Sequence, residues 1–429
     1  MALINVHIRP DRTTWAELLR RPVKDASQLT KTVGEVLRAV KEGGDEALKA
    51  YERKFDHVEL GSLLVSEAEM EEAERQVSKE LRQAMELAHR NIATFHRGQA
   101  FKGEHCLVTE GVECWQKSVP IEKVGLYIPG GTAPLFSTVL MLATPARIAG
   151  CREIVLCSPP SSEGRIHPAI LVAARIAGVG RVFKLGGVQA IAAMAYGTES
   201  VPRVFKILGP GNQYVTCAKQ MVSPTEVAID MPAGPSEVMV LADASSNAAF
   251  VASDLLSQAE HGVDSQVLLL TTDEGIVEQV QSQVEAQLRT LPRRDIAAQA
   301  LRNSRIVVLP SDEQMMEMAN LYAPEHLIIE TKNYKELAER VVNAGSVFLG
   351  SLTPESAGDY ASGTNHTLPT NGYATAYSGV NLDTFCRKVT FQHINEQGIR
   401  SIGRAVEVMA EAESLDAHRL AMSLRRNSI

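Results

Sequence analysis

Val124-Gly-Leu-Tyr-Ile-Pro-Gly-Gly131 opens the stretch of sequence, residues 123–222, that decides the fold. A β-rich run, a turn rich in glycine or proline and an apolar helical segment follow one another in it four times. Strands that alternate with helices indicate a parallel sheet covered by helices, and ligands bind such sheets at the carboxyl ends of the strands. The predicted strands are 124–128, 153–157, 181–185 and 203–208, and the predicted helices are 138–149, 170–177, 190–196 and 215–221.

A second α/β region follows, and the remaining chain is mainly helical in pattern. Residues 27–98 are charged, with apolar residues at helical spacing, and are expected to form a helical layer. From about Asp383 the tail also looks helical and charged, which leaves open an extended docking arm or a separate domain. Two similar α/β halves are therefore expected. The strands predicted for the second half are 236–242, 266–271, 304–309, 326–330 and 346–350, around a helix that carries Gln258 and His261.

The composition is that of an ordinary soluble globular protein and argues against several other classes. A chain of 429 residues predicts two or more domains. Its 43 basic and 51 acidic residues give a net charge of −8, and only 5% are aromatic, which argues against a nucleic-acid surface. The longest apolar run is too short for a membrane span. Six cysteines without a Cys-x-x-Cys pair indicate a reducing compartment with mostly buried thiols, so we expect a cytoplasmic protein.

Glycine pairs lie at three of the predicted strand-to-helix turns. They are Gly130-Gly131, Gly186-Gly187 and Gly209-Pro-Gly211-Asn212. Glycine lets the backbone approach a phosphate, and the start of the following helix favours negative charge. The Gly-x-Gly-x-x-Gly fingerprint of standard dinucleotide binding is absent. Simple tight turns and a nucleotide or other anionic ligand both remain open at this point.

Four scattered residues form a candidate metal site. Gln258 and His261 lie three residues apart, where a helix would present both on one face. Asp359 lies in Glu355–His366, which is polar and glycine-rich and is expected to be a loop, and His418 lies near the end of the chain. One amide oxygen, one carboxylate and two imidazoles suit zinc first, with manganese or cobalt as alternatives. Taken singly, a helical histidine is more often structural.

Glu325 and His326 form a candidate proton-transfer pair. They follow a proline that disfavours a helical backbone at Ala323. Imidazole titrates near neutral pH, and a neighbouring carboxylate can orient it or activate a water. The alternative interpretation is an ordinary loop that leads into the strand at residue 327.

Five blocks of the sequence closely resemble histidinol dehydrogenases, and they are spread over nearly the whole chain. The resemblance implies that L-histidinol is oxidised through L-histidinaldehyde to L-histidine with two NAD⁺. The blocks are 124–139, Asp230-Met-Pro-Ala-Gly-Pro-Ser236, Ser257-Gln-Ala-Glu-His-Gly262, Ala323-Pro-Glu-His-Leu327 and Ser356-Ala-Gly-Asp-Tyr-Ala-Ser-Gly-Thr-Asn-His366.

The resemblance also implies a role for each matching residue. His326 is expected to take the alcohol proton as hydride leaves for NAD⁺, and Glu325 is expected to activate water. One zinc ion per subunit would orient the substrate through its imidazole and amino nitrogens. The expected zinc ligands, which also contact substrate, are Gln258, His261, Asp359 and His418. The other expected contacts are Ser236, His326, Glu413 and, further, His366 for substrate, and Tyr127, Gln189 and Asn212 for NAD.

The family's architecture is two incomplete Rossmann-like α/β domains with small N- and C-terminal extensions, in a homodimer whose C-terminal arms cross over. His418 and Glu413 would then complete the partner's site. The implied division is 1–21 for the N-terminal extension, 22–124 with 236–380 for a large α/β domain carrying the metal and catalytic residues, 125–235 for the NAD-binding domain, and 381–429 for a helical arm.

Two other functions remain to be distinguished. A related zinc- and NAD-dependent dehydrogenase of another small alcohol would share most of the machinery, but the presence of Ser236 and Glu413 favours histidinol. A zinc-binding protein without turnover would not need both Glu325 and His326. No nucleic-acid or membrane partner is expected.

Overall fold

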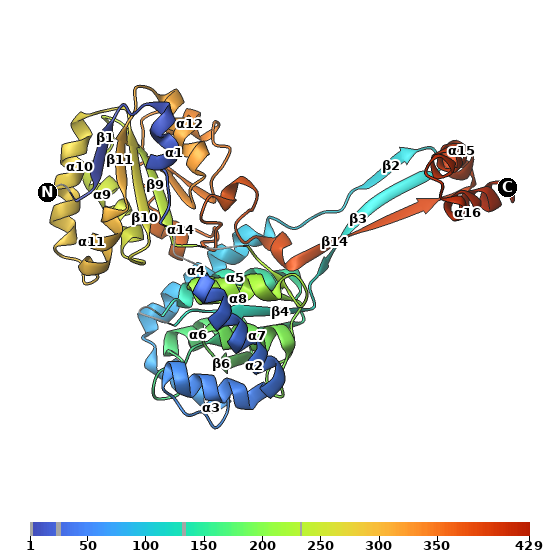
Figure 1. The fold of residues 1–429 in the computed structure, drawn as a ribbon, viewed down its shortest axis with the longest axis horizontal. Helices are drawn as coiled ribbons and strands as arrows, with labels where there is room; N and C mark the ends of the chain where they lie inside the picture. The colour runs from blue at the N-terminus through green and yellow to red at the C-terminus, as the bar shows by residue number, and fades with distance from the viewer. Residues whose placement is uncertain (1–2, 23–26, 131–133, 232–233) are drawn as a thin grey trace.

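Two α/β units and a long projecting arm make up the chain (Figure 1). This computed structural model describes residues 3–22, 27–130, 134–231 and 234–429. Both units are parallel sheets with helices on two faces, as the alternation of strands and helices predicted. Gly131, part of the first glycine turn, lies outside the described residues. In the described part of the chain, no helix combines the length and apolar character needed to cross a bilayer.

The first unit is a six-stranded sheet in the order β1-β11-β10-β9-β12-β13, in which all neighbours are parallel. Its central strands are apolar on both sides because helices cover both faces. α9, α10 and α11 pack on one face, and α1, α12 and α13 on the other. The strands are β1 (Asn5–Ile8), β9 (Glu237–Ala242), β10 (Gln266–Thr271), β11 (Arg305–Val308), β12 (His326–Ile329) and β13 (Ser346–Leu349). The helices are α1 (Trp15–Leu18), α9 (Ala248–Ala259), α10 (Gly275–Leu288), α11 (Arg294–Arg302), α12 (Asp312–Tyr322), α13 (Tyr334–Ala338) and α14 (Glu355–Tyr360).

The second unit is a five-stranded parallel sheet in the order β6-β5-β4-β7-β8. α3 to α6 pack on one face, and α2, α7 and α8 pack on the other. The strands are β4 (Lys123–Tyr127), β5 (Glu153–Ser158), β6 (Arg181–Lys184), β7 (Lys206–Leu208) and β8 (Ala228–Ile229). The helices are α2 (Ser27–Tyr51), α3 (Glu67–Gln76), α4 (Lys79–Arg97), α5 (Phe136–Ala149), α6 (Pro168–Ile176), α7 (Gly187–Tyr196) and α8 (Gln213–Val222).

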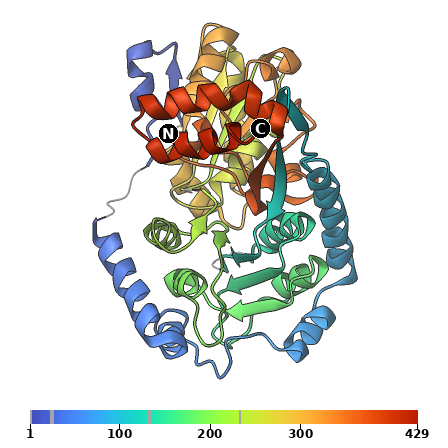
Figure 2. The same ribbon diagram turned by 90° about the vertical axis from the view of Figure 1, so that its right-hand side faces the viewer.

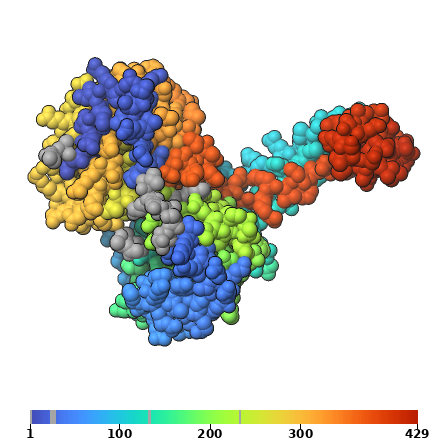
Figure 3. All heavy atoms as spheres, in the orientation of Figure 1, coloured from blue at the N-terminus to red at the C-terminus, as the bar shows by residue number. Residues whose placement is uncertain are grey.

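The arm is an antiparallel ribbon of three strands with two helices at its tip (Figures 1 and 2). β14 (Cys386–Ile394) pairs along its whole length with β3 (Val112–Pro120), and β2 (His105–Thr109) pairs with the other edge of β3. α15 (Glu396–Ala412) and α16 (Asp416–Arg426) pack against each other. In Figure 3 this tip stands clear of both units. Within the single chain, the tip therefore packs against neither of the two α/β units.

The tail differs from the prediction because it begins with a strand. Residues 386–394 were expected to be helical, but Val389, Thr390 and Phe391 are strand-forming residues that find a partner in β3, a distant segment. The cysteines also differ from expectation, since only Cys151 and Cys157 are buried and the other four are at least partly exposed.

The helices of residues 27–97 lie on the five-stranded sheet, whereas the expected division assigned residues 22–124 to the domain of the metal residues. Val33 and Val36 of α2 share a core with Ala190 of α7 and Val215 of α8. Met85 of α4 packs in the core on the opposite face of the same sheet. The amphipathic pattern predicted the helices correctly but could not say which sheet they would cover.

Candidate active site

The metal and proton-transfer candidates meet at the amino ends of two neighbouring strands. Glu237 begins β9, His326 begins β12, and the strands run parallel with His326 opposite Val238. α12 ends at Tyr322, and Ala323 then adopts a left-handed conformation with φ of 50°, so the non-helical backbone expected before Pro324 is confirmed. This site therefore lies at the end of the sheet opposite to the one where ligands usually bind.

Gln258 anchors the site from the last turn of α9. Its Nε2 donates to the Glu237 carbonyl at 3.1 Å and lies 3.1 Å from His326 Nδ1. Its Oε1 is buried and has no hydrogen-bond partner among the described residues. A buried carbonyl oxygen without a partner is uncommon, and it fits a ligand such as a divalent cation.

His326 is placed to act as a base through Nε2. Its Nδ1 lies 3.2 Å from the Glu237 carbonyl, so a proton on Nδ1 would donate to that oxygen and leave the Nε2 lone pair available. Nε2 is buried without a hydrogen bond within the described chain, and it lies 3.6 Å from Asp359 Oδ1. Burial opposes the charged imidazolium, but the carboxyls of Glu355 and Glu325 outweigh it and raise the pKa of His326 well above its usual range. The neighbouring carboxyls thus favour the protonated ring, which must release that proton before it can act as a base.

Carboxyl groups surround His326 on two sides. Glu325 Oε2 accepts the Glu237 amide at 2.9 Å and lies 3.6 Å from His326 Nδ1. His326, Glu355 and Asp359 each offer a ligand atom, and these atoms lie within 4.8 Å of one another. Burial opposes ionisation of Asp359, but the neighbouring His326 imidazole lowers its pKa overall. The donors present therefore fit a divalent cation.

Residues 355–360, which include Asp359, form a short helix, α14, although a loop was expected over 355–366; residues 361–366 form no helix or strand, as expected. Glu355, at its start, is only 1% exposed, and burial raises its pKa well above the usual range. Gly358 packs so closely that a Cβ there would lie 2.6 Å from the Phe348 ring. The glycine that suggested a loop thus permits close packing of the helix.

His261 lies just beyond α9, which ends at Ala259, so the expectation that this helix carries His261 is wrong. The side chain remains near the site: its Nδ1 lies 3.5 Å from Ser236 Oγ, which joins a candidate metal ligand to a candidate substrate contact. His366 is half-buried, its Nε2 has no partner in the described structure, and burial lowers its pKa.

His418 and Glu413 are not brought to this site within the chain. Both are exposed at the tip of the arm, His418 in α16 and Glu413 directly after α15. Figure 1 shows the tip far from β9. Within the described chain, Gln258, His261 and Asp359 therefore lie in one region, whereas His418, the fourth expected zinc ligand, lies far from them.

A cavity of about 990 Å³ connects the two units and contains the expected NAD contacts. His261 lines it from the six-stranded unit, and Tyr127, Gln189 and Asn212 line it from the five-stranded unit. The further lining residues are Thr32, Val36, Phe55, Asp56, Pro129, Gly130, Leu135, Pro159, Gly187, Val188, Tyr214, Glu260, Arg293 and Tyr360.

The five-stranded side of the cavity is built from helix N-termini and close backbone contacts. α7 begins at Gly187, whose amide donates to Tyr127 Oη at 3.1 Å. Asn212 caps α8, because its Oδ1 accepts the Tyr214 amide at 3.0 Å. Gly209 has φ of +127°, and a Cβ on it would lie 2.1 Å from the Tyr127 carbonyl oxygen. Two helix starts beside glycine turns suit the phosphates of a dinucleotide.

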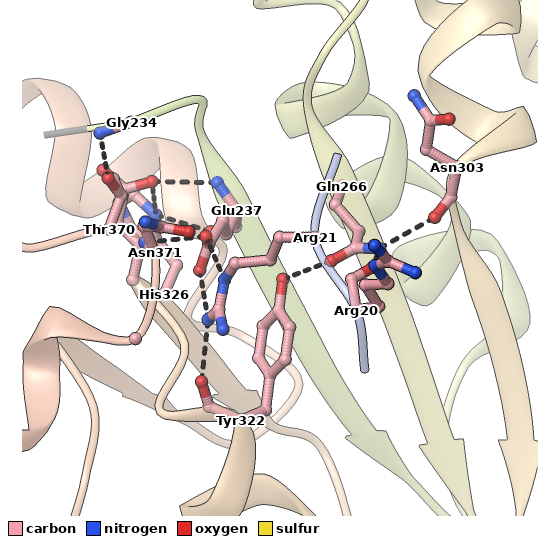
Figure 4. A network of polar contacts seen from close by, with 12 residues as sticks. Arg20, Arg21, Gly234, Glu237, Gln266, Asn303, Tyr322, His326, Thr370 and Asn371 are labelled. Carbon is pink, nitrogen blue, oxygen red and sulfur yellow. Dashed lines mark hydrogen bonds and ion pairs between the residues drawn. The ribbon is translucent and has the colours of Figure 1, made fainter. Parts of the chain in front are cut away.

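A buried ion pair supports this amino end of the sheet, and sequence reasoning did not find it (Figure 4). Arg21 Nε and Nη2 contact the Glu237 carboxylate at 2.6 and 2.8 Å, and Nη2 also donates to the Tyr322 carbonyl at 2.7 Å. Glu237 Oε1 accepts the Asn371 amide at 2.8 Å. A charged residue that opens the apolar strand 237–242 was the available signal. Its partner lies 216 residues away, so no local pattern identifies it.

Comparison with known proteins gives one consistent result. The sequence profile of histidinol dehydrogenase matches residues 19–426. The chain is 63% identical over 420 residues to a histidinol dehydrogenase of Bacteroides thetaiotaomicron, covering 98% of each, and 52% identical over 416 residues to one of Escherichia coli K12, covering 96% and 95%. A crystal structure of histidinol dehydrogenase from Elizabethkingia anophelis superposes with a TM-score of 0.98 at 53% identity, covering 100% of this chain and 99% of that one. The similarity extends over both units and the arm.

Proposed function

The chain belongs to the histidinol dehydrogenase family, and from that premise we propose how its own residues carry out the reaction. It is an NAD-dependent oxidoreductase of histidine biosynthesis. The proposal concerns the roles of individual residues, the metal and the assembly. It rests on one observation above all: Gln258 lies 3.1 Å from His326, with Glu325 and Asp359 beside them. Tyr360, which follows Asp359 in the chain, and His261 line the cavity that contains the expected NAD contacts.

His326 acts as the base in both oxidations. In the first, its Nε2 takes the hydroxyl proton of L-histidinol while hydride passes from the same carbon to NAD⁺, which gives L-histidinaldehyde and NADH. Water then adds to the aldehyde carbon: Glu325 takes the proton that the water loses, and protonated His326 gives its proton to the former carbonyl oxygen, which completes the hydrate and leaves His326 neutral. In the second oxidation, His326 takes a hydroxyl proton of the hydrate while its hydride passes to a second NAD⁺, which leaves the carboxyl group of L-histidine.

Zinc, one ion per subunit, would be held by Gln258, His261 and Asp359 together with His418 of the partner subunit. The unpartnered Gln258 Oε1 and the mixed nitrogen and oxygen donors support this choice. Bound there, zinc would hold the substrate by its imidazole and amino nitrogens. Ser236, the partner's Glu413 and His366 complete the substrate contacts. Tyr127, Gln189 and Asn212 hold NAD.

The active species is then a homodimer with exchanged arms in the cytoplasm. The tip carries both His418 and Glu413 and stands clear of its own units, which supports delivery to a second copy. The division of the chain into an N-terminal extension, a catalytic domain, an NAD domain and an arm remains part of this proposal, except that the helices of residues 27–97 pack on the sheet of the NAD domain.

Turnover of purified, zinc-loaded protein tests the reaction. With L-histidinol and excess NAD⁺ we expect two NADH for each histidine formed. The His326→Asn variant should turn over at least about 100-fold more slowly with unchanged zinc content, because it loses the base but no metal ligand. His89→Asn, on α4 away from the cavity, serves as the control. NADH produced only with another alcohol, or wild-type turnover in His326→Asn, would contradict the proposal.

Mixed dimers test the exchange of arms. Subunits carrying His261→Ala and subunits carrying His418→Ala should each be inactive as homodimers. If arms cross, a heterodimer contains one intact site and should show about half of the wild-type activity. If each chain supplied its own His418, no site in the heterodimer would be intact, and activity would stay absent.

A further inference from the structure

An acidic pair lies at the end of the cavity formed by the five-stranded unit. Glu52 and Asp56 begin and end a π-helical turn that continues α2. Asp56 lines the cavity beside Gly187 and Gln189. A Cβ on Gly186 would lie 3.4 Å from Asp56 Oδ2, so this carboxylate sits at the turn where α7 begins. Neither acid has a role in the reaction described above.

Glu52 lies between Asp56 and Gln189, one of the expected NAD contacts. Glu52 is fully buried, and its Oε1 accepts the Gly186 amide at 3.2 Å and Gln189 Nε2 at 2.9 Å. Burial, followed by the nearby Asp56 charge, raises the pKa of Glu52 to about 8. Burial also raises the pKa of Asp56. Of the two acids, Asp56 is the one that lines the cavity.

The basic groups that line the cavity are at its other end. They are His261 and Arg293, and both belong to the six-stranded unit. Lys54, on the same turn as Asp56, is absent from the lining; its ammonium lies 5.2 Å from the ring centroid of Phe55. Among the described lining residues, a dianionic phosphate at the Asp56 end would therefore meet a carboxylate and no cation.

We propose that Asp56 recognises a ribose diol of the dinucleotide and thereby selects NAD⁺ over its 2′-phosphorylated form. A carboxylate can accept hydrogen bonds from two neighbouring hydroxyls, whereas a 2′-phosphate removes one donor and adds like charge. An acidic residue has this function in many dinucleotide-binding folds, although it normally follows the glycine fingerprint that is missing here. In this chain the acidic residue, Asp56, lies instead in the π-helical turn that continues α2. The inference rests on the proposed cofactor site.

Binding of two cofactor fragments tests this without turnover. Titration calorimetry of zinc-loaded wild type, Asp56→Asn and Glu59→Gln would use ADP-ribose and 2′-phospho-ADP-ribose. Glu59 is a control because its side chain is 81% exposed and it is not part of the cavity lining. Asp56→Asn should bind ADP-ribose about 10-fold more weakly, as expected for a lost charge-assisted hydrogen bond, and bind the phosphorylated fragment as well as or better than wild type.

Steady-state kinetics with NAD⁺ and NADP⁺ provide the second measurement. The ratio of kcat/KM for NADP⁺ to that for NAD⁺ should rise at least about 10-fold in Asp56→Asn, through KM, with kcat for NAD⁺ nearly unchanged. An unchanged ratio, an equal loss for both fragments, or the same change in Glu59→Gln would overturn the role of Asp56. If wild type binds neither fragment and makes no NADH, the proposed cofactor site itself fails.

Discussion

Replacing Arg21 by Met should strongly destabilise the six-stranded unit. The guanidinium makes two contacts to Glu237 and one to the Tyr322 carbonyl, and it lies 3.9 Å from the centroid of the Tyr322 ring. The side chains are only 17% and 3% exposed. Removing one member of such a pair leaves a buried charge without compensation, which costs about 3–5 kcal/mol in the free energy of unfolding. Arg21→Lys should lower the free energy of unfolding by less, because lysine keeps the charge but not the paired hydrogen-bond geometry.

Urea unfolding followed by Trp15 fluorescence measures this loss locally. Trp15 is buried in the same core as Tyr322, and Trp115→Phe removes the other tryptophan, which lies on the arm. Arg9→Met is the matched control, since Arg9 and Glu274 pair at 3.0 Å with side chains 66% and 50% exposed. An exposed pair of this kind contributes less than about 1 kcal/mol.

A double-mutant cycle then separates the pair from its surroundings. Arg21→Met with Glu237→Gln removes both charges, so the double variant should be destabilised by less than the sum of the two single variants. A loss below about 1 kcal/mol for Arg21→Met, or strictly additive losses, would refute the argument that the pair compensates buried charge.

Three further predictions concern the five-stranded unit. Gly209→Ala should lower the free energy of unfolding by more than about 1 kcal/mol, because φ is +127° and the new Cβ would lie 2.1 Å from a backbone oxygen of β4. Gly180→Ala is the control: a Cβ at Gly180 has nothing within 4 Å, so this variant should be nearly neutral in the same urea titration. Lys219→Met should raise KM for NAD⁺ in steady-state kinetics with little change in kcat. The reason is that Lys219 pairs with buried Asp230 and donates to the Gly209 carbonyl at 2.9 Å. An unchanged KM would contradict this prediction. Folded Glu52 keeps its proton up to about pH 8 while the unfolded chain releases it near the usual value of 4.5, so its contribution to stability is lost as pH rises between these values. The stability of wild type relative to Glu52→Gln should therefore fall across that range, and a constant difference would show that Glu52 does not titrate there.

Local patterns in the sequence predicted most of the secondary structure and the candidate residues. The run from Val124 to Val222 predicted β4 to β7 and the helices between them, because apolar periodicity and glycine turns act over a few residues. Similarity of motifs pointed to Gln258, His326 and Asp359, which the fold brings together. Composition was less reliable for the segment at Glu355, where buried packing overrode a polar pattern.

Tertiary structure alone decided which distant segments meet. The amphipathic pattern of α2 requires an apolar surface but does not specify one, so packing determined that it covers the five-stranded sheet and brings Glu52 to Gln189. The pairing of Arg21 with Glu237 likewise depends on how the chain returns across the sheet. Charge and hydrogen-bond partners separated by more than a hundred residues leave no periodic trace in the sequence, because their contact energy depends on position in space and not on spacing along the chain.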